Sequence, residues 1–126
     1  MTRTDHDIEM LRRFAARRAE RRRLSLEAKL AEARRDFEQI VAYLVREHRP
    51  ARIYQWGSLL RPEHFSEISD IDIAVEGLTG PLSGLDAAAG AERLTSFPVD
   101  LVELERIHPA HAESIRRHGK LVYERG

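Results

Sequence analysis

The feature that most constrains the fold is a pair of aspartates, two residues apart, at the start of an apolar segment. Asp70 and Asp72 open the run Asp-Ile-Asp-Ile-Ala-Val-Glu, whose alternation predicts a strand. Side chains along a strand alternate between its faces, so both carboxylates are expected on one face. The other face is then an apolar row of Ile71, Ile73 and Val75 that needs a core. Neighbouring carboxylates repel each other unless a cation neutralises them, and their oxygen atoms suit a hard divalent ion such as Mg²⁺.

A short strand and a tight turn are expected before this pair. The segment from Arg52 to Trp56 is partly β-branched and aromatic, which favours a buried strand, and it leads into Gly57 and Ser58. A glycine at such a corner lets the backbone approach a ligand closely, and the N–H groups that follow can converge on phosphate oxygens. Trp56 itself is expected in the core, with contact to a base at the site as the alternative. The polar connection from Leu59 to Ser69 predicts a loop or a short helical turn.

A third aspartate stands on another expected strand, which runs from Phe97 to Leu104. On this strand Asp100 shares a face with Val102 and Leu104, so it is the one polar group in an otherwise apolar row. A carboxylate in that position is a candidate third ligand beside Asp70 and Asp72.

This ordered set resembles the nucleotidyltransferase superfamily related to DNA polymerase beta. Most of all it is similar to the minimal nucleotidyltransferase (MNT) proteins, small bacterial chains often encoded beside a HEPN-domain partner. The resemblance spans Ala51 to Glu124 and implies an α+β (two-layer) fold, in which a small mixed sheet packs against helices. It also implies a catalytic site for nucleotidyl transfer that holds two Mg²⁺ ions on Asp70, Asp72 and Asp100.

The resemblance assigns the turn at Gly57 and Ser58 to the phosphates of the nucleotide. The usual family pattern has ten residues between the serine and the first aspartate, often with an arginine directly after the serine. Here 11 residues intervene and leucines follow the serine, so the first arginine, Arg61, is the expected phosphate-binding side chain.

The activity implied by the resemblance is transfer of a nucleoside monophosphate, expected to be AMP from ATP. MNT relatives include antitoxins that adenylylate a tyrosine of a HEPN ribonuclease toxin. We therefore expect a protein adenylyltransferase that acts as an antitoxin on a HEPN-family partner. Two alternatives stay open: a binding module that neutralises or scaffolds its partner by contact, and a small-molecule nucleotidyltransferase that assembles as a homo-oligomer.

Helices are expected on both sides of this stretch. Residues 7–23 lack glycine and proline and carry seven arginines beside a thin apolar stripe, which predicts a weakly amphipathic helix. Ser25 is expected to cap a second, core-packing helix that ends at Pro50. Shorter helices are expected over 85–94 and 108–119, the latter with Gly119 as its C′ residue, and a last strand over 121–123. The three histidines of residues 108–119 could share a face, but a zinc site from them alone is disfavoured.

At 126 residues the chain is expected to form one domain, an MNT domain over 25–126. A basic helical extension over 1–24 is expected to precede it. It has no cysteine, no apolar run near the ~20 residues that span a membrane, and no apolar segment following the polar N-terminus. These features predict a cytoplasmic protein without a signal peptide. The net charge is zero with its basic excess near the N-terminus, so direct binding of nucleic acid is not expected.

Overall fold

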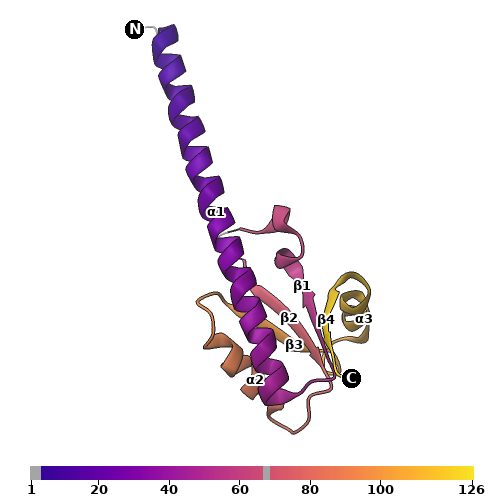
Figure 1. The fold of residues 1–126 in the computed structure, drawn as a ribbon. Coiled ribbons are helices and arrows are strands. Elements are labelled where there is room, and N and C mark those ends of the chain that lie inside the picture. Colours follow the sequence, from indigo (N-terminus) through magenta and orange to yellow (C-terminus); the bar gives the residue numbers. More distant parts are fainter. Residues whose placement is uncertain (1–3, 67–68) are drawn as a thin grey trace.

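The computed structural model describes residues 4–66 and 69–126, and within them four strands form one mixed sheet (Figure 1). The strands are β1 (Arg52–Trp56), β2 (Ile71–Glu76), β3 (Val99–Glu103) and β4 (Lys120–Glu124), in the sheet order β3-β2-β1-β4. Strand β1 is antiparallel to both β2 and β4, whereas β2 and β3 are parallel. The helices are α1 (Asp5–His48), α2 (Ser83–Glu92) and α3 (Pro109–His118). Two 3₁₀ turns, η1 (Gly57–Leu59) and η2 (Pro62–His64), follow β1.

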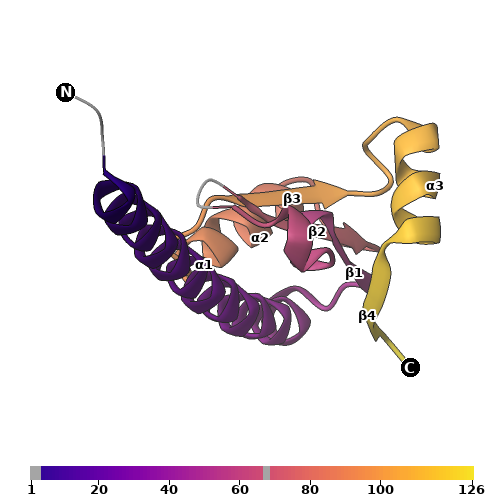
Figure 2. The same cartoon turned by 90° about the horizontal axis from the view of Figure 1, so that it is seen from above.

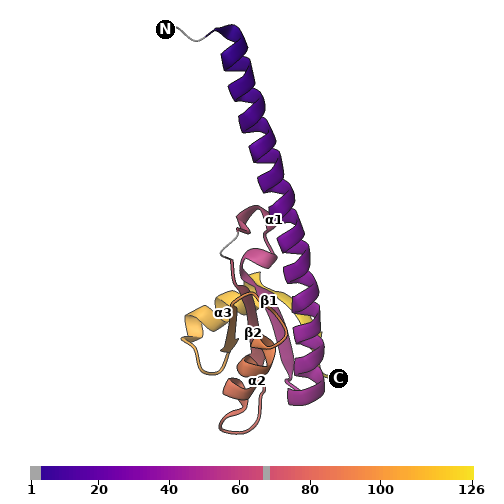
Figure 3. The same ribbon diagram turned by 90° about the vertical axis from the view of Figure 1, so that its left-hand side faces the viewer.

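Helices cover both faces of the sheet, α1 and α2 on one and α3 on the other (Figures 2 and 3). The expected apolar row of β2 lies in the larger core cluster, where Ile71, Ile73 and Val75 pack with Phe37 and Ile40 of α1. The face that carries Asp72 also carries a smaller cluster, which joins strand residues to α3 through Tyr54, Ala74, Leu104, Ala112 and Ile115. Each fully buried aliphatic side chain contributes about 1.5–3 kcal/mol, so these clusters fix the strands. The predicted α+β fold is confirmed.

Helix α1 is continuous, and the predicted second helix capped by Ser25 is wrong. The cap lies at Thr4, whose hydroxyl accepts a hydrogen bond from the Asp7 N–H while the Asp7 carboxylate accepts one from the Thr4 N–H. No glycine or proline interrupts the residues that follow, so an exposed Ser25 is accommodated inside the helix. Residues 4–25 are exposed, and Leu26 is the first partly buried residue.

The remaining elements agree with the sequence to within two residues at each end, except for the backbone at Gly119. This residue adopts φ −75° and ψ 175°, which is extended rather than left-handed. A Cβ atom here would lie 2.5 Å from the Ile115 carbonyl oxygen and 3.0 Å from that of Gln55. Glycine is therefore required by the close passage of the chain from α3 into β4, not by a left-handed conformation.

An ion-pair network ties the strands together at the end of the sheet remote from Asp72. The Arg52 guanidinium contacts Glu76 at 2.8 Å and Glu124 at 2.6 Å, and Arg116 of α3 contacts Glu76 at 2.7 Å. Burial alone would raise the pKa of Glu76, but hydrogen bonds and charge from the two guanidinium groups outweigh it and lower that pKa. In the described part of the chain, no helix is both long and apolar enough to cross a membrane.

Candidate active site

The three aspartates predicted from the sequence come together at one end of the sheet. Asp72 lies on β2 directly opposite Asp100 on the parallel strand β3, and Asp70 immediately precedes β2. The Ile71 N–H donates a 2.8 Å hydrogen bond to the Pro98 carbonyl, which aligns the starts of the two strands. The register of β2 and β3 therefore places these carboxylates together.

Asp72 is the least exposed of the three carboxylates, and its charge is disfavoured. Burial, followed by the negative charges of Asp100 and Asp70, raises the pKa of Asp72 from 3.8 to about 6. Asp70 and Asp100 are both exposed. The charge of a carboxylate placed beside two like charges is stabilised by a nearby cation.

Gly57 touches the same carboxylate from the other side. Its φ of +79° is a left-handed conformation that favours glycine, and a Cβ atom there would overlap the Asp72 carboxylate. The neighbouring residue Trp56 is paired directly opposite Asp72 across β1 and β2. The turn after β1 and Asp72 of β2 are thus neighbours, although 14 residues separate Gly57 from Asp72 in sequence.

The donor set suits a hard divalent cation, but a closed cage is not preformed. All three groups offer carboxylate oxygen atoms, which Mg²⁺ prefers over the nitrogen and sulfur ligands of zinc sites. Among residues 4–66 and 69–126, no three His, Cys, Asp or Glu side chains gather closely enough to hold a metal ion.

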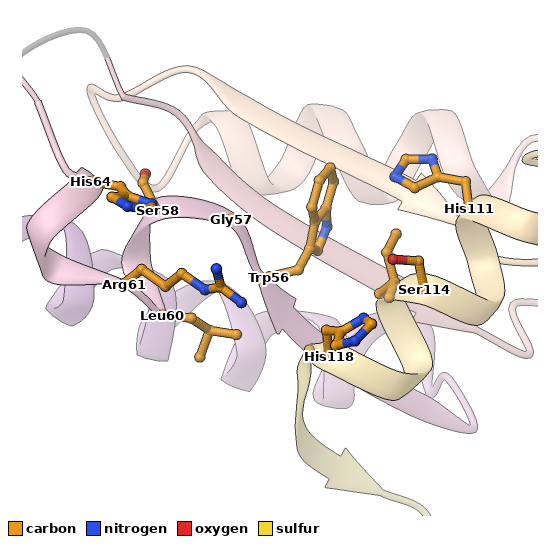
Figure 4. Close-up of a pocket in the computed structure, with 11 residues that line it drawn as sticks. Trp56, Gly57, Ser58, Leu60, Arg61, His64, His111, Ser114 and His118 are labelled. Carbon is orange, nitrogen blue, oxygen red and sulfur yellow. The ribbon is translucent and has the colours of Figure 1, made fainter.

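A cleft of about 390 Å³ opens beside Gly57. One wall is formed by the η1–η2 segment with Ser58, Arg61 and His64, and the opposite wall by α3 (Figure 4). The predicted phosphate-binding residues Gly57, Ser58 and Arg61 all line this cleft. None of the three aspartates lines it, but Gly57 and Trp56 both line the cleft and neighbour Asp72, so they connect the two.

Trp56 stands between the two walls of the cleft (Figure 4). It packs against the smaller core cluster, as expected for a core residue, but it also lines the cleft. Its ring meets His111 of α3 edge to face, with 5.5 Å between ring centroids and an interplanar angle of 84°. The indole Nε1 is buried and has no hydrogen-bond partner among the described residues, which costs about 1–3 kcal/mol for a donor of this kind.

The α3 wall was not predicted as part of the site. His111, Ser114 and His118 line the cleft, whereas His108 caps α3 by accepting a 3.1 Å hydrogen bond from the Ala110 N–H. The spacing of seven between His111 and His118 shows in the sequence that the two share a helix face. Only the packing of α3 on β1 and β2 shows that this face is turned toward Ser58.

Comparison with known families agrees with this geometry. The model of the family described as "Polymerase beta, Nucleotidyltransferase" matches residues 38–126, which include every site residue described above. The chain belongs to this nucleotidyltransferase family. The match begins inside α1, earlier than the expected start at Ala51.

Solved structures add a closer likeness within the nucleotidyltransferases. A toxin–antitoxin complex with AMP-PNP is 25% identical with a TM-score of 0.58, covering 70% of this chain and 73% of that one. A mutant of the toxin–antitoxin MntA–HpeT is also 25% identical, with a TM-score of 0.52 and coverage of 70% and 72%. A structure described as a minimal nucleotidyltransferase shares the fold at 24% identity and a TM-score of 0.57, covering 78% of this chain and 94% of that one. A comparison with curated proteins finds no match.

The resemblance to minimal nucleotidyltransferases that the motifs predicted is therefore confirmed, and nucleotidyl transfer is supported as the general activity.

Proposed function

We propose that this nucleotidyltransferase moves AMP from ATP to a side-chain hydroxyl of a partner protein. The observation that carries the proposal is Asp72, which lies in register with Asp100 and against Gly57 beside a cleft. In the proposed reaction an acceptor oxygen forms a bond to the α-phosphorus of ATP. The bond from that phosphorus to the β-phosphate breaks, and pyrophosphate leaves with the electron pair.

Asp70, Asp72 and Asp100 are the proposed catalytic residues and the ligands of two Mg²⁺ ions. Such ions, when bound, supply the positive charge that a phosphoryl-transfer site needs on its attacking and leaving oxygens. Asp100 stands on the exposed edge strand β3, where an incoming acceptor can reach it. Its carboxylate would orient the acceptor hydroxyl and receive its proton before passing it to water.

Gly57, Ser58 and Arg61 are the proposed phosphate-binding residues. N–H groups at the start of a helical turn have no acceptor inside that turn, so those of η1 are suited to phosphate oxygens. The Arg61 guanidinium adds a permanent positive charge to the same cleft. The edge-to-face rings of Trp56 and His111 add aromatic surface beside them, against which an adenine ring can pack.

The proposed acceptor is a HEPN-family toxin, with this chain as its antitoxin. Support comes from the toxin–antitoxin complexes among the similar structures, one of which contains AMP-PNP.

A second candidate function is neutralisation of the partner by contact alone. The exposed N-terminal half of α1 favours it, because a helix in this position offers a binding surface independent of catalysis. The two functions differ in whether the aspartates are needed.

The test is the intact mass of the partner protein after incubation with this chain, ATP and Mg²⁺. We expect the mass to rise by whole adenylyl groups with the wild-type chain and with Asp86→Asn, an exposed control in α2. We expect no rise with the double variant Asp70→Asn/Asp72→Asn. An unmodified partner in a stable complex with the wild-type chain would contradict adenylyl transfer and favour neutralisation by contact.

A further inference from the structure

The first half of α1 projects from the rest of the molecule as a free arm (Figures 1 and 3). We define the arm as residues 4–25, all of which are exposed. At 1.5 Å per residue it extends for about 30 Å. The family match begins at residue 38, so the arm is an addition to the nucleotidyltransferase unit.

One face of the arm is apolar and continues the face that packs on the sheet. Ile8 and Leu11 are 40% and 50% exposed, and Ala15 and Ala19 follow them at helical spacing. Further along, the same stripe becomes the buried residues Ala33, Phe37, Ile40 and Leu44. Most of the stability of a helix in a protein comes from packing of its apolar face, so an uncovered stripe of this kind is expected to gain a partner.

Positive charge borders the apolar face. A shallow hollow over Ala15 and Ala19 is flanked by Arg18, Arg22 and Arg23. Arg23 pairs with Glu20 and Glu27, whereas Arg18 and Arg22 form no ion pair within the described ranges 4–66 and 69–126. The small alanines permit a close approach of another helix, and the two arginines call for carboxylates at its edges.

We propose that the arm docks an amphipathic helix of a partner protein whose apolar stripe is flanked by acidic side chains. A second copy of this chain fits poorly, because Arg18 and Arg22 would meet their own equivalents in a parallel pair and Arg12 would meet Arg18 in an antiparallel pair about Ala15. Nucleic acid would satisfy the arginines but leave Ile8 and Leu11 exposed.

The arm leaves the body at the end of the sheet that holds the candidate site. Helix α1 passes beside η1, the turn that begins at Gly57, and the arm continues beyond it (Figure 1). A helix docked on the apolar face would therefore lie beyond the end of the sheet that carries Asp72. That the docked protein is also the AMP acceptor rests on the function proposed above, whereas docking itself does not.

The docking is tested by fluorescence anisotropy with the full-length chain and a labelled peptide of three heptads, with leucine at a and d positions and glutamate at e and g. We expect binding that Leu11→Asp weakens at least roughly tenfold, and that Met10→Asp, on the opposite face, leaves unchanged. Two double variants test the role of charge. Arg18→Glu/Arg22→Glu reverses the charge beside the apolar face, and Arg17→Glu/Arg21→Glu reverses it on the opposite face. Only the first pair is expected to weaken binding, and circular dichroism checks the helix content of each variant.

Three outcomes would overturn the docking proposal. In the first, the acidic peptide binds no better than the same peptide with lysine at e and g, or the two faces respond alike. In the second, a single-stranded RNA of 20 nucleotides binds the arm more tightly than the peptide does. In the third, sedimentation shows a dimer of the chain that Leu11→Asp dissociates. Because none of these measurements uses ATP, failure of docking is distinguishable from failure of adenylyl transfer.

Discussion

Asp72 is held where its charge is disfavoured, between Asp100 on the next strand and the backbone of Gly57. Burial and two like charges raise its pKa to about 6, which is a cost to the folded protein near neutral pH. Groups with shifted pKa values cluster at functional sites, where a ligand can offset the cost of their charge. The backbone conformation of Gly57 and the raised pKa of Asp72 each lead to a testable prediction.

Replacing Gly57 with alanine should abolish transfer and destabilise the fold. A Cβ atom at φ +79° is strained, and it would collide with the Asp72 carboxylate. We expect a loss of roughly 1–3 kcal/mol in the free energy of unfolding by urea. The matched control is Gly80→Ala, at φ +98° with open space around the site of the Cβ atom, which should carry the backbone strain without the loss of transfer.

Replacing Asp72 with asparagine should stabilise the metal-free protein above pH 6. The pKa of Asp72 is raised in the folded state, so protonation of Asp72 stabilises the fold. This stabilisation is fully present below about pH 3.8 and is lost as the pH rises through about 6. Asparagine stays neutral throughout, and because Asp72 is only half-buried the gain is on the order of 1 kcal/mol at pH 8. Urea unfolding in EDTA at pH 4 and pH 8 measures it, and a variant less stable than wild type at pH 8 would contradict this assignment.

Added Mg²⁺ should reverse the order of stability of the same two proteins. An ion that binds only the folded state raises the wild-type free energy of unfolding at pH 8, whereas Asp72→Asn loses a ligand and gains little. Thermal unfolding across a Mg²⁺ titration checks this. An equal shift in both proteins would show that Asp72 does not hold the ion.

Ion pairs hold the strands in register at one end of the sheet, and Asp72 and Asp100 lie at the other end. Arg52 joins β1 to β2 and β4, and Arg116 ties α3 to Glu76 of β2. Glu76 is largely buried, so it depends on both guanidinium groups. Because α3 also forms one wall of the cleft, this network helps to fix the cleft width.

Replacing Glu76 with glutamine should destabilise the fold by about 1–2 kcal/mol, since its charge-assisted contacts with the partly exposed Arg52 and Arg116 lose their acceptor charge. The pKa of Glu76 is lowered in the folded state, so its contribution is present above the ordinary value of 4.5 and is lost as the pH falls below it. Wild type and Glu76→Gln should therefore converge in stability at low pH. Glu113→Gln, which removes an exposed pair with Arg117, is the control and should cost less than 1 kcal/mol.

The elements show where the sequence was sufficient and where it was not. Alternation identified β2 and β3 because each strand has one apolar face, and the glycine before Ser58 marked the turn. The prediction of a helix start at Ser25 is wrong because a serine caps a helix only where the preceding helix has ended. No glycine or proline near Ser25 ends the preceding helix. The pattern Thr4-x-x-Asp7 held the correct cap and was readable from sequence.

For the whole molecule, the grouping of the three aspartates was predictable and the cleft was not. Local alternation places Asp70, Asp72 and Asp100 on their strands, and the order of the motif indicates that they belong together. The α3 wall depends on Ala112 and Ile115 packing on Tyr54 and Ala74, which are residues distant in sequence. Periodicity shows which face of α3 is apolar, but not where that face is placed.

Transfer of AMP to the partner protein is tested most directly by tracing the α- and γ-phosphates of ATP separately. The chain is incubated with its partner protein, Mg²⁺ and ATP labelled at either the α- or the γ-phosphate. We predict that the α-label stays on the partner and the γ-label leaves as pyrophosphate, both only while Asp70 and Asp72 are intact. Retention of the γ-label, or of neither label in a stable complex, would contradict nucleotidyl transfer to the partner.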